Sequence, residues 1–323
     1  MNRTLATEFI LLGFSKDFRV NIFLFLLFLG IYLVTIIGNV LIMSLIVTTP
    51  NLCTPMYFFL CILSFLDLCM STCVVPRLLA DLLSTVRLIS LGACTMQFYT
   101  NLLMSGTESY LLALMAYDRY IAICRPLHYP VLMRWSICYR LTALLWITSF
   151  IVFILPCLLM PIDLCYPNHI NHYMCEVLAV MQLACDTIYL SEVMITVNCF
   201  ISLFLPFFFI IVSYACIISS VLRIHSKTKS KAFSTCTSHI TVVILVYGTA
   251  MILYFSPSSQ HSTSYGKYLS LFSYIICPSL NPLIYSLNNK EVKDTSRKVF
   301  VRLSIALQSK IFNADPQNAS LGQ

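Results

Sequence analysis

Two acidic residues lie in the middle of long apolar segments of this chain. Asp67 stands within LSFLDLC, and Glu108 stands within SGTESYLLALMAYDRY. An ionised group at the centre of a bilayer costs about 2.5–3.5 kcal/mol, so such groups face a bundle interior or a wet cavity. Together, two carboxylates could bind a monovalent cation such as sodium, share a proton, or relay protons in a transporter. The alternative is a hydrogen-bonded cluster that only fixes packing, and the residues alone leave these roles open.

A pair of adjacent opposite charges, Asp118 and Arg119, follows at the end of the same segment, in MAYDRYIAICRPLHY. Ten residues separate Glu108 from Asp118, which is nearly three helical turns or about 15 Å, so both lie on one helix face. A charge pair at a membrane edge is costly to bury, so it needs a binding partner or a functional role. The patterns HExxH and GxSxG and a glycine-rich phosphate loop are absent from the sequence, which therefore predicts no enzyme.

Composition indicates that lipid is the solvent of this chain. Hydrophobic residues make up 59% and charged residues 10% of its 323 residues, the mean hydropathy is +0.85, and soluble domains carry about 25% charged residues. A span needs about 20 apolar residues. Prolines 76, 156, 206 and 278 lie inside such stretches and predict kinks rather than helix ends. The sequence predicts an all-α membrane protein, a seven-transmembrane helix bundle with spans at roughly 22–48, 56–83, 93–124, 138–160, 190–224, 232–258 and 265–288.

The distribution of Lys and Arg predicts an extracellular N-terminus. That orientation places 14 of the 20 basic residues inside and six outside, although three precede the first span. Asn2 begins a glycosylation sequon, and a second sequon at Asn318 would then lie on the other side. The net charge of +7 suits an anionic inner leaflet and a cytoplasmic partner rather than nucleic acid. The predicted divisions are an extracellular N-terminus (1–21), the seven-transmembrane domain (22–288), an amphipathic cytoplasmic helix (289–312) and a disordered tail (313–323).

Four of the fifteen cysteines fall in predicted outside segments: Cys94, Cys165, Cys175 and Cys185. An even number in an oxidising space favours two disulfides, for which four cysteines allow three connectivities. His172, Cys175 and Glu176 could instead ligate a metal ion, but their spacing is not a strong zinc pattern. The disulfide interpretation is therefore preferred, with the connectivity open at this point.

The chain resembles the odorant receptors of the rhodopsin-like G-protein-coupled receptor superfamily, in their tetrapod-type class. The resemblance rests on PMYFFL (55–60), LSFLDLC (63–69), MAYDRYIAIC (115–124), LHYP (127–130), KAFSTCTSH (231–239) and PSLNPLIYSLNN (278–289). The sequence departs from the family where Cys53 replaces the usual His before TPMY. No Cys follows Cys277, which excludes palmitoylation of the tail.

The resemblance implies roles for particular residues. Arg119 would form a lock with Asp118 and reach Tyr214 in the active state, while Asp67 and Glu108 would make a cation-binding core for a structural sodium ion. Disulfides Cys94–Cys175 and Cys165–Cys185 are implied. The implied set for switching and G-protein coupling is Asp118, Arg119, Tyr120, Tyr214, His239, Asn281, Pro282 and Tyr285.

By the same resemblance, a small volatile odorant would bind between helices three, five and six. It would activate a stimulatory, olfactory-type heterotrimeric G protein and raise cyclic AMP. The rivals are another small-molecule or peptide receptor of the superfamily and a proton or sodium transporter. Asn101 stands where aminergic receptors carry Asp. No Lys occurs between Lys267 and Lys290, so the seventh helix has no lysine that could bind retinal. The implied pocket is Asn101, Leu102, Ser105, Gly106, Asn198, Cys199, Ser202, Tyr247, Gly248, Ala250, Met251 and Tyr254.

Overall fold

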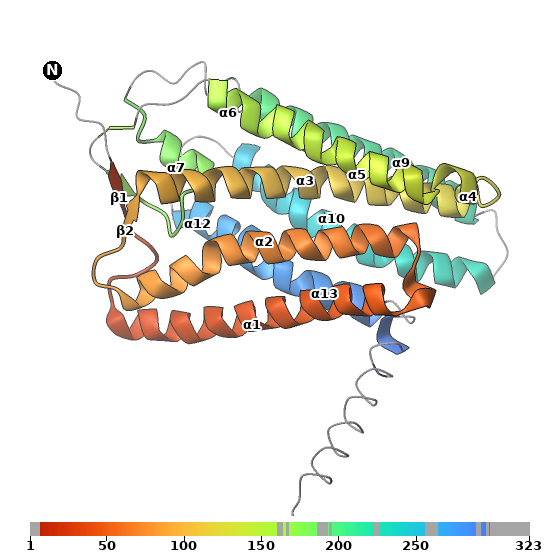
Figure 1. Ribbon diagram of the computed structural model, residues 1–323, viewed down its shortest axis with the longest axis horizontal. Coiled ribbons are helices and arrows are strands. Elements are labelled where there is room, and N and C mark those ends of the chain that lie inside the picture. The colour runs from red at the N-terminus through yellow and green to blue at the C-terminus, as the bar shows by residue number, and fades with distance from the viewer. Residues whose placement is uncertain are drawn as a thin grey trace, which may run out of the picture.

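The helices of this protein run side by side along its long dimension (Figure 1). The computed structural model describes residues 7–159, 164–165, 168–185, 193, 196–222, 227–255, 264–288, 292–294 and 297. Asn2 and the tail lie outside these residues, as does most of the expected amphipathic helix. Five helices are long and apolar enough to cross a membrane: Phe18–Thr48, Pro55–Leu83, Trp135–Leu159, Thr196–Leu222 and Cys236–Phe255.

The described residues form seven long helical segments. The first three are α1 (Phe18–Thr48), α2 (Pro55–Leu83) and α3 (Leu91–Cys124). The fourth joins α5 (Trp135–Ser149), η2 (Phe150–Ile154) and α6 (Leu155–Leu159), and the fifth includes η3 (Phe200–Phe204) and α9 (Leu205–Leu222). The sixth is α10 (Lys227–Phe255), and the seventh joins α12 (Ser264–Leu271), η4 (Phe272–Ile276) and α13 (Cys277–Asn288). Short helices are η1 (Pro50–Leu52), α4 (Tyr129–Leu132) and α7 (Val177–Met181).

Three of these segments widen into a π-helical turn just before a proline. The turns η2, η3 and η4 precede Pro156, Pro206 and Pro278 respectively. A proline has no N–H, and its ring clashes with the carbonyl four residues earlier in an α-helix. A wider turn relieves that clash without ending the helix. The helices therefore continue through these prolines, as predicted, whereas α2 stays α-helical around Pro76.

A small three-stranded sheet closes one end of the bundle, called here the sheet end. Strand β1 (Glu8–Leu11) lies between β2 (Leu88–Ser90), which is antiparallel to it, and β3 (His169–Ile170), which is parallel. The all-α prediction missed this sheet because strands of two to four residues are too short to show a period in sequence. Phe9 and Leu11 point into a small apolar cluster beneath it, so the strands stabilise the end of the bundle.

The segment before α1 is bound to the bundle by two cationic side chains that donate hydrogen bonds to its backbone carbonyl groups. Arg87 donates from its guanidinium to the carbonyl oxygens of Leu12 and Ser15, both at 2.9 Å. Lys267 donates to the carbonyl of Gly13 at 2.8 Å, where the backbone turns at a φ of 63°. The helix α1 then begins at Phe18 rather than at residue 22. Residues predicted only as an N-terminal extension therefore form part of the packed structure.

The sheet end is also tied by two disulfides, Cys94–Cys175 and Cys165–Cys185. The first joins the start of α3 to the segment after β3 and closes a sequence separation of 81 residues. Cys175 also donates its backbone N–H to Oε1 of Gln97 at 2.8 Å. The segment that carries α7 is therefore held against α3 by one covalent bond and one buried hydrogen bond.

Replacing Cys94 by Ser should reduce the amount of folded protein delivered to the cell surface. Opening a loop of this length removes about 4 to 5 kcal/mol of chain-entropy stabilisation. Surface labelling of cells that express each variant measures the effect. The exposed free Cys53 supplies the matched control, since Cys53→Ser should leave delivery unchanged. Equal surface levels for Cys94→Ser and the unaltered chain would contradict this prediction.

Candidate functional site

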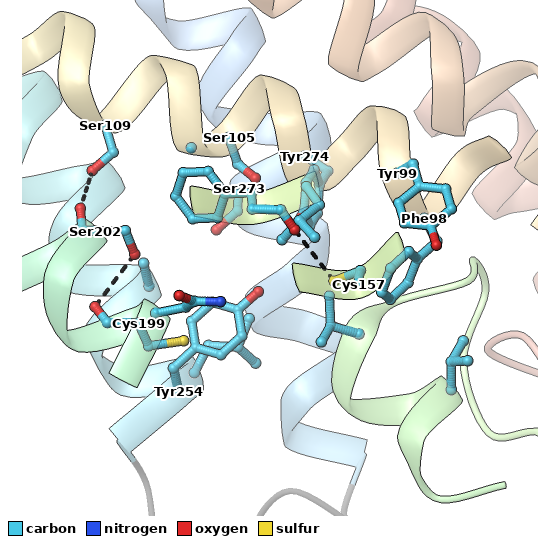
Figure 2. Close-up of a pocket in the computed structure, with 18 of the residues that line it drawn as sticks. Phe98, Tyr99, Ser105, Ser109, Cys157, Cys199, Ser202, Tyr254, Ser273 and Tyr274 are labelled. Carbon is cyan, nitrogen blue, oxygen red and sulfur yellow. Dashed lines mark hydrogen bonds between the residues drawn. The ribbon is translucent and has the colours of Figure 1, made fainter. Parts of the chain in front are cut away.

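A cavity of about 360 Å³ lies between the helices near the sheet end. This volume lies within the range of small-molecule sites. Figure 2 shows Phe98, Tyr99, Ser105 and Ser109 along α3, with Ser202 and Tyr254 contributed by other helices. All three π turns contribute to its lining: η2 through Phe153, η3 through Ser202 and Leu203, and η4 through Ser273 and Tyr274.

The cavity is lined by most of the residues that the resemblance implied. Four of the twelve, Asn101, Tyr247, Gly248 and Met251, do not line it. Asn101 is buried, and neither of its side-chain polar atoms is hydrogen-bonded to a described residue. Tyr247 is buried next to the cavity residue Ser109. The eight that line it (12 − 4) are Leu102, Ser105, Gly106, Asn198, Cys199, Ser202, Ala250 and Tyr254.

The structure adds lining residues that sequence reasoning missed. Several come from η2, α6, α7 and η4, four regions that the expected set did not include, and two lie near the start of α3. Glu108, predicted only as part of a cation site, also lines the cavity. The hydropathy pattern carried no signal for the others, because apolar and aromatic residues occur throughout these helices. The principal additions are Phe98, Tyr99, Phe153, Cys157, Val177, Val180, Ser273 and Tyr274.

Ser109 connects the cavity to two other helices. Its Oγ lies 2.8 Å from the carbonyl oxygen of Ser202 and 2.9 Å from Oη of Tyr247. The Tyr247 hydroxyl donates in turn to the carbonyl oxygen of Ser109 at 2.7 Å. All three groups are buried, so α3, η3 and α10 meet at one polar junction on the cavity wall.

A second polar cluster surrounds Asp67 in the middle of α2. Asn281 donates from Nδ2 to both carboxyl oxygens of Asp67 at 3.0 Å, and its own Oδ1 is buried without a partner among the described residues. Asn39 donates to the carbonyl of Pro278 at 3.0 Å, and its Oδ1 likewise has no partner in the part of the chain that the structure describes. Asp67 and Glu108 lie within electrostatic range of each other. This cluster joins α1, α2 and α13 through oxygen-rich groups.

At the opposite end of α3, Asp118 and Arg119 are both buried. Asp118 accepts a hydrogen bond from Oη of Tyr129 at 2.9 Å. Nε and Nη1 of Arg119 are buried and make no hydrogen bond in the described part of the chain. Adjacent residues on a helix do not face each other, which explains why the expected contact of Asp118 with Arg119 is replaced by one with Tyr129. Tyr120 is half-buried beside this pair.

His239 joins three helices near Arg119. Its Nε2 lies 3.0 Å from the carbonyl oxygen of Leu112, and its Nδ1 lies 2.8 Å from Oη of Tyr214. A carbonyl only accepts, so Nε2 carries the proton and Nδ1 accepts from the tyrosine hydroxyl. Tyr285 is buried, and its hydroxyl has no hydrogen-bond partner within the described ranges. Pro282 lies against Gly38, where an added Cβ would be 2.9 Å from Cβ of Pro282, so α1 and α13 approach closely there.

The segment above the cavity carries two buried titratable groups. Burial raises the pKa of Glu176 to about 7, although its carboxylate accepts hydrogen bonds from the backbone N–H groups of Leu178 and Ala179. Burial, with Lys267 nearby, lowers the pKa of His172 to about 3. Cys175 lies in a disulfide and has no thiolate to offer, so the metal-site alternative is excluded. Within the described residues, no group of three or more His, Cys, Asp or Glu could hold a metal ion.

The protein is thus a helical membrane bundle with a ligand-sized cavity near the sheet end and buried polar groups near the other end. The olfactory receptor family profile matches residues 28–303. Mouse olfactory receptor 5AR1 is 43% identical over 300 residues, which is 92% of this chain and 97% of that protein. The human olfactory receptor 2F1 is 43% identical over 312 residues (96% and 98%), and human 11L1 is 44% identical over 303 residues (93% and 94%).

The chain therefore belongs to the olfactory receptor family of G-protein-coupled receptors. It is a multi-pass membrane protein that senses odorants through a G protein, and it is not an enzyme. This membership confirms the family predicted from the sequence, and the transporter alternative is not retained.

Replacing Gly106 by Ala should destabilise the protein through one identified collision. A Cβ at this position would overlap Cε2 of Phe153, whereas a Cβ at Gly248 would meet nothing within 4 Å among the described residues. Overpacking of this kind costs about 1–3 kcal/mol, while Gly248→Ala should stabilise its helix by about 0.5–1 kcal/mol. Thermal unfolding midpoints of the purified protein provide the measurement, and Phe153→Leu should rescue Gly106→Ala. An unchanged midpoint for Gly106→Ala would show that Phe153 does not occupy this space.

Replacing Glu176 by Gln should change how stability depends on pH. Because the pKa of Glu176 is raised from 4.5 to about 7 in the folded protein, the folded state binds this proton more tightly than the unfolded state. The stabilisation that comes from this proton is full below pH 4.5 and is lost as pH rises through 7. The free energy of unfolding then falls by about 2–3 kcal/mol. The unfolding midpoint of the unaltered chain, relative to that of Glu176→Gln, should therefore fall between pH 5 and pH 8. His172 titrates in both proteins, so its effect cancels in the difference. Parallel curves of unfolding midpoint against pH for the two proteins would contradict the prediction.

Proposed function

We propose that a small volatile odorant binds in the cavity and shifts the bundle to a state that activates a stimulatory, olfactory-type G protein and raises cyclic AMP. The observation that carries this proposal is the Ser109 junction. Ser109 lines the cavity and is hydrogen-bonded to Tyr247 of α10. A ligand that contacts this wall therefore acts on the helix that also carries His239.

In this proposal all seven long segments cross the membrane, with the N-terminus extracellular and an amphipathic eighth helix (289–312) on the inner leaflet. The excess of Lys and Arg on the Arg119 side of the bundle supports this orientation. The sheet end then faces outside, where disulfides form. Cys94 and Thr95 line the cavity at this end, so the cavity lies near the outer surface.

The signal would pass along α10. Tyr254 lines the cavity and His239 is bonded to α3 and α9. The two residues are 15 positions apart, which is about 22 Å of helix. Outward movement of α10 would break the bonds of Tyr247 and His239 to α3. It would also give the unpartnered donors of Arg119 access to Tyr214 and to the G protein. A ligand need favour this state by only a few kcal/mol to change its population.

A sodium ion is the cation that the inner acids would hold. Asp67 and Glu108 supply carboxylate oxygens, and the orphaned Oδ1 of Asn281 adds a carbonyl oxygen beside them. Hard cations prefer such oxygen ligands. The ion would balance two acids in the bundle interior and favour the arrangement of α2, α3 and α13 seen here.

The proposal as a whole is tested by expressing the chain in cells with an olfactory-type G protein and measuring cyclic AMP against a chemically diverse panel of odorants. A concentration-dependent response to at least one compound, absent from untransfected cells, is the expected result. Activation of a different G-protein class by every active compound would reject the coupling assigned here.

Replacing Arg119 by Ala should abolish the ligand-driven cyclic AMP response while the protein remains at the cell surface. The substitution removes the buried donors that the proposal assigns to the G protein. Arg140, which is exposed on α5, provides a control of equal charge, and Arg140→Ala should keep most of the response. A normal response of Arg119→Ala at equal surface level would remove this residue from the coupling step.

A further inference from the structure

Residues 7–17, called here the strap, pack on the part of the chain that covers the cavity. That cover is residues 168–181, called here the lid, which carries β3 and α7. The lid residues Val177, Val180 and Met181 line the cavity. Strand β1 of the strap lies at the same end of the bundle as α7 (Figure 1), so the strap and the lid form two layers over the cavity.

The strand β1 reaches the cavity wall through one apolar cluster. Phe9 and Leu11 are buried in this cluster together with Cys94, and Leu164 and Val180 pack against it. The last three of these residues also line the cavity. Only one layer of side chains therefore separates the strap from the space in which a ligand would bind.

The end of the strap makes a second connection of the same kind. Gly13 donates its backbone N–H to the carbonyl oxygen of His172 in the lid at 3.1 Å. Phe14 stacks on Tyr173 of the lid, with ring centroids 5.0 Å apart. Tyr173 belongs to one apolar cluster with the cavity residue Tyr274. The strap thus holds the lid against the cavity at both of its ends.

The contacts that hold the strap to the helices are polar and reversible. Arg87 donates to the carbonyl oxygens of Leu12 and Ser15, and Lys267 of α12 donates to that of Gly13. A Cβ at Gly13 would overlap Nη1 of Arg87, so glycine is required where these groups converge. The three bonds are exposed or only partly buried. Water can replace such bonds, so this region belongs to the part of a fold that opens locally.

The lid, in contrast, is fixed at one point by a covalent bond. Cys175 is joined to Cys94 of α3 and also donates its backbone N–H to Gln97. The cavity-lining residues of α7 follow directly after this point. The lid therefore cannot leave the bundle, but the residues on either side of Cys175 can turn about it once the strap is released.

We propose that the strap is a latch on the cavity: when it releases Arg87 and Lys267, the lid turns about Cys175 and opens the cavity to water at the sheet end. The proposal concerns entry to the cavity, so it does not depend on the class of odorant or of G protein. Opening then limits how fast a ligand enters and leaves. The rival is entry from lipid between two helices, on which the strap would have no influence.

Two free thiols on the cavity wall, Cys157 and Cys199, report access without a known ligand. The probe is 2-(trimethylammonium)ethyl methanethiosulfonate, whose fixed charge keeps it out of lipid. It transfers its thioalkyl group to a thiol and releases methanesulfinate. Purified full-length receptor in lipid nanodiscs is labelled, and peptide mass spectrometry gives the rate at each thiol. At low reagent concentration the rate follows the population of the open state. The exposed Cys53 reports the activity of the reagent.

A cross-link between β1 and β2 should keep the latch closed. Ile10 and Leu88 are opposite each other in this antiparallel pair, and Cα atoms at such positions are about 4.5–5.5 Å apart, a distance that a disulfide can bridge. Ile10→Cys combined with Leu88→Cys should slow the labelling of both cavity thiols by about tenfold or more. Ile10→Ser combined with Leu88→Ser is the matched control without a cross-link and should label like the unaltered receptor.

Weakening the latch should have the opposite effect. Lys267→Ala removes the charge-assisted bond to Gly13, so the open state becomes more populated and both cavity thiols should be labelled about five- to tenfold faster. Lys16, an exposed cation of the strap itself, supplies the control. Lys16→Ala should leave the labelling rates within twofold.

The latch is supported by slower labelling in the cross-linked receptor together with faster labelling in Lys267→Ala. It is overturned if the cross-linked receptor labels as fast as its Ser-substituted control, which is the result expected for entry from lipid. Equal rates for Lys267→Ala and Lys16→Ala overturn it as well. If Lys267→Ala does not fold, the cross-linked pair decides the outcome alone, since Leu88 is exposed and Ile10 is not part of the buried core.

Discussion

A polar side chain in the interior of this bundle must be hydrogen-bonded by the protein itself, either by its own helix or by a neighbouring one, because lipid offers no hydrogen bonds. Helix α3 supplies most of these partners along its length. Gln97 accepts from the backbone of Cys175, Ser109 meets Tyr247, and the carbonyl of Leu112 meets His239. The disulfide at Cys94 adds a covalent link at the start of the same helix. The positions of the helices around α3 depend on this sequence of contacts.

The sequence was sufficient for features that follow from solvent and composition. Lipid requires long apolar helices, and five of the expected spans meet the criteria of length and apolarity. Asp67 and Glu108 could be expected to turn inward because an ionised group facing lipid is costly. The small sheet could not be foreseen, since each strand is short and its partners lie far away in the chain. The anchoring of the N-terminal segment by Arg87 and Lys267 depends on those same distant contacts.

The cavity was predicted in outline and missed in detail for a geometric reason. Sequence spacing gives the helix on which a residue lies, but it does not give the rotation of that helix about its axis. A π-helical turn holds an extra residue and rotates everything beyond it. Ser273 and Tyr274, on such a turn, face the cavity, while Gly248 and Met251, on the regular helix α10, do not line it. The two ends of a segment interrupted in this way cannot be placed on one continuous helical wheel.

The three π turns give the cavity a mechanical property as well as a shape. Each is a place where the backbone is wound less tightly than in the rest of its helix, and all three lie at the level of the cavity. The cavity therefore borders the points at which the fourth, fifth and seventh segments depart from regular α-helical geometry. If one of these π turns became a regular α-helical turn, the helix would be narrower at that point. The half of the helix beyond the proline would rotate. The residues that give the cavity its shape are therefore also the residues at which three of its helices change their winding.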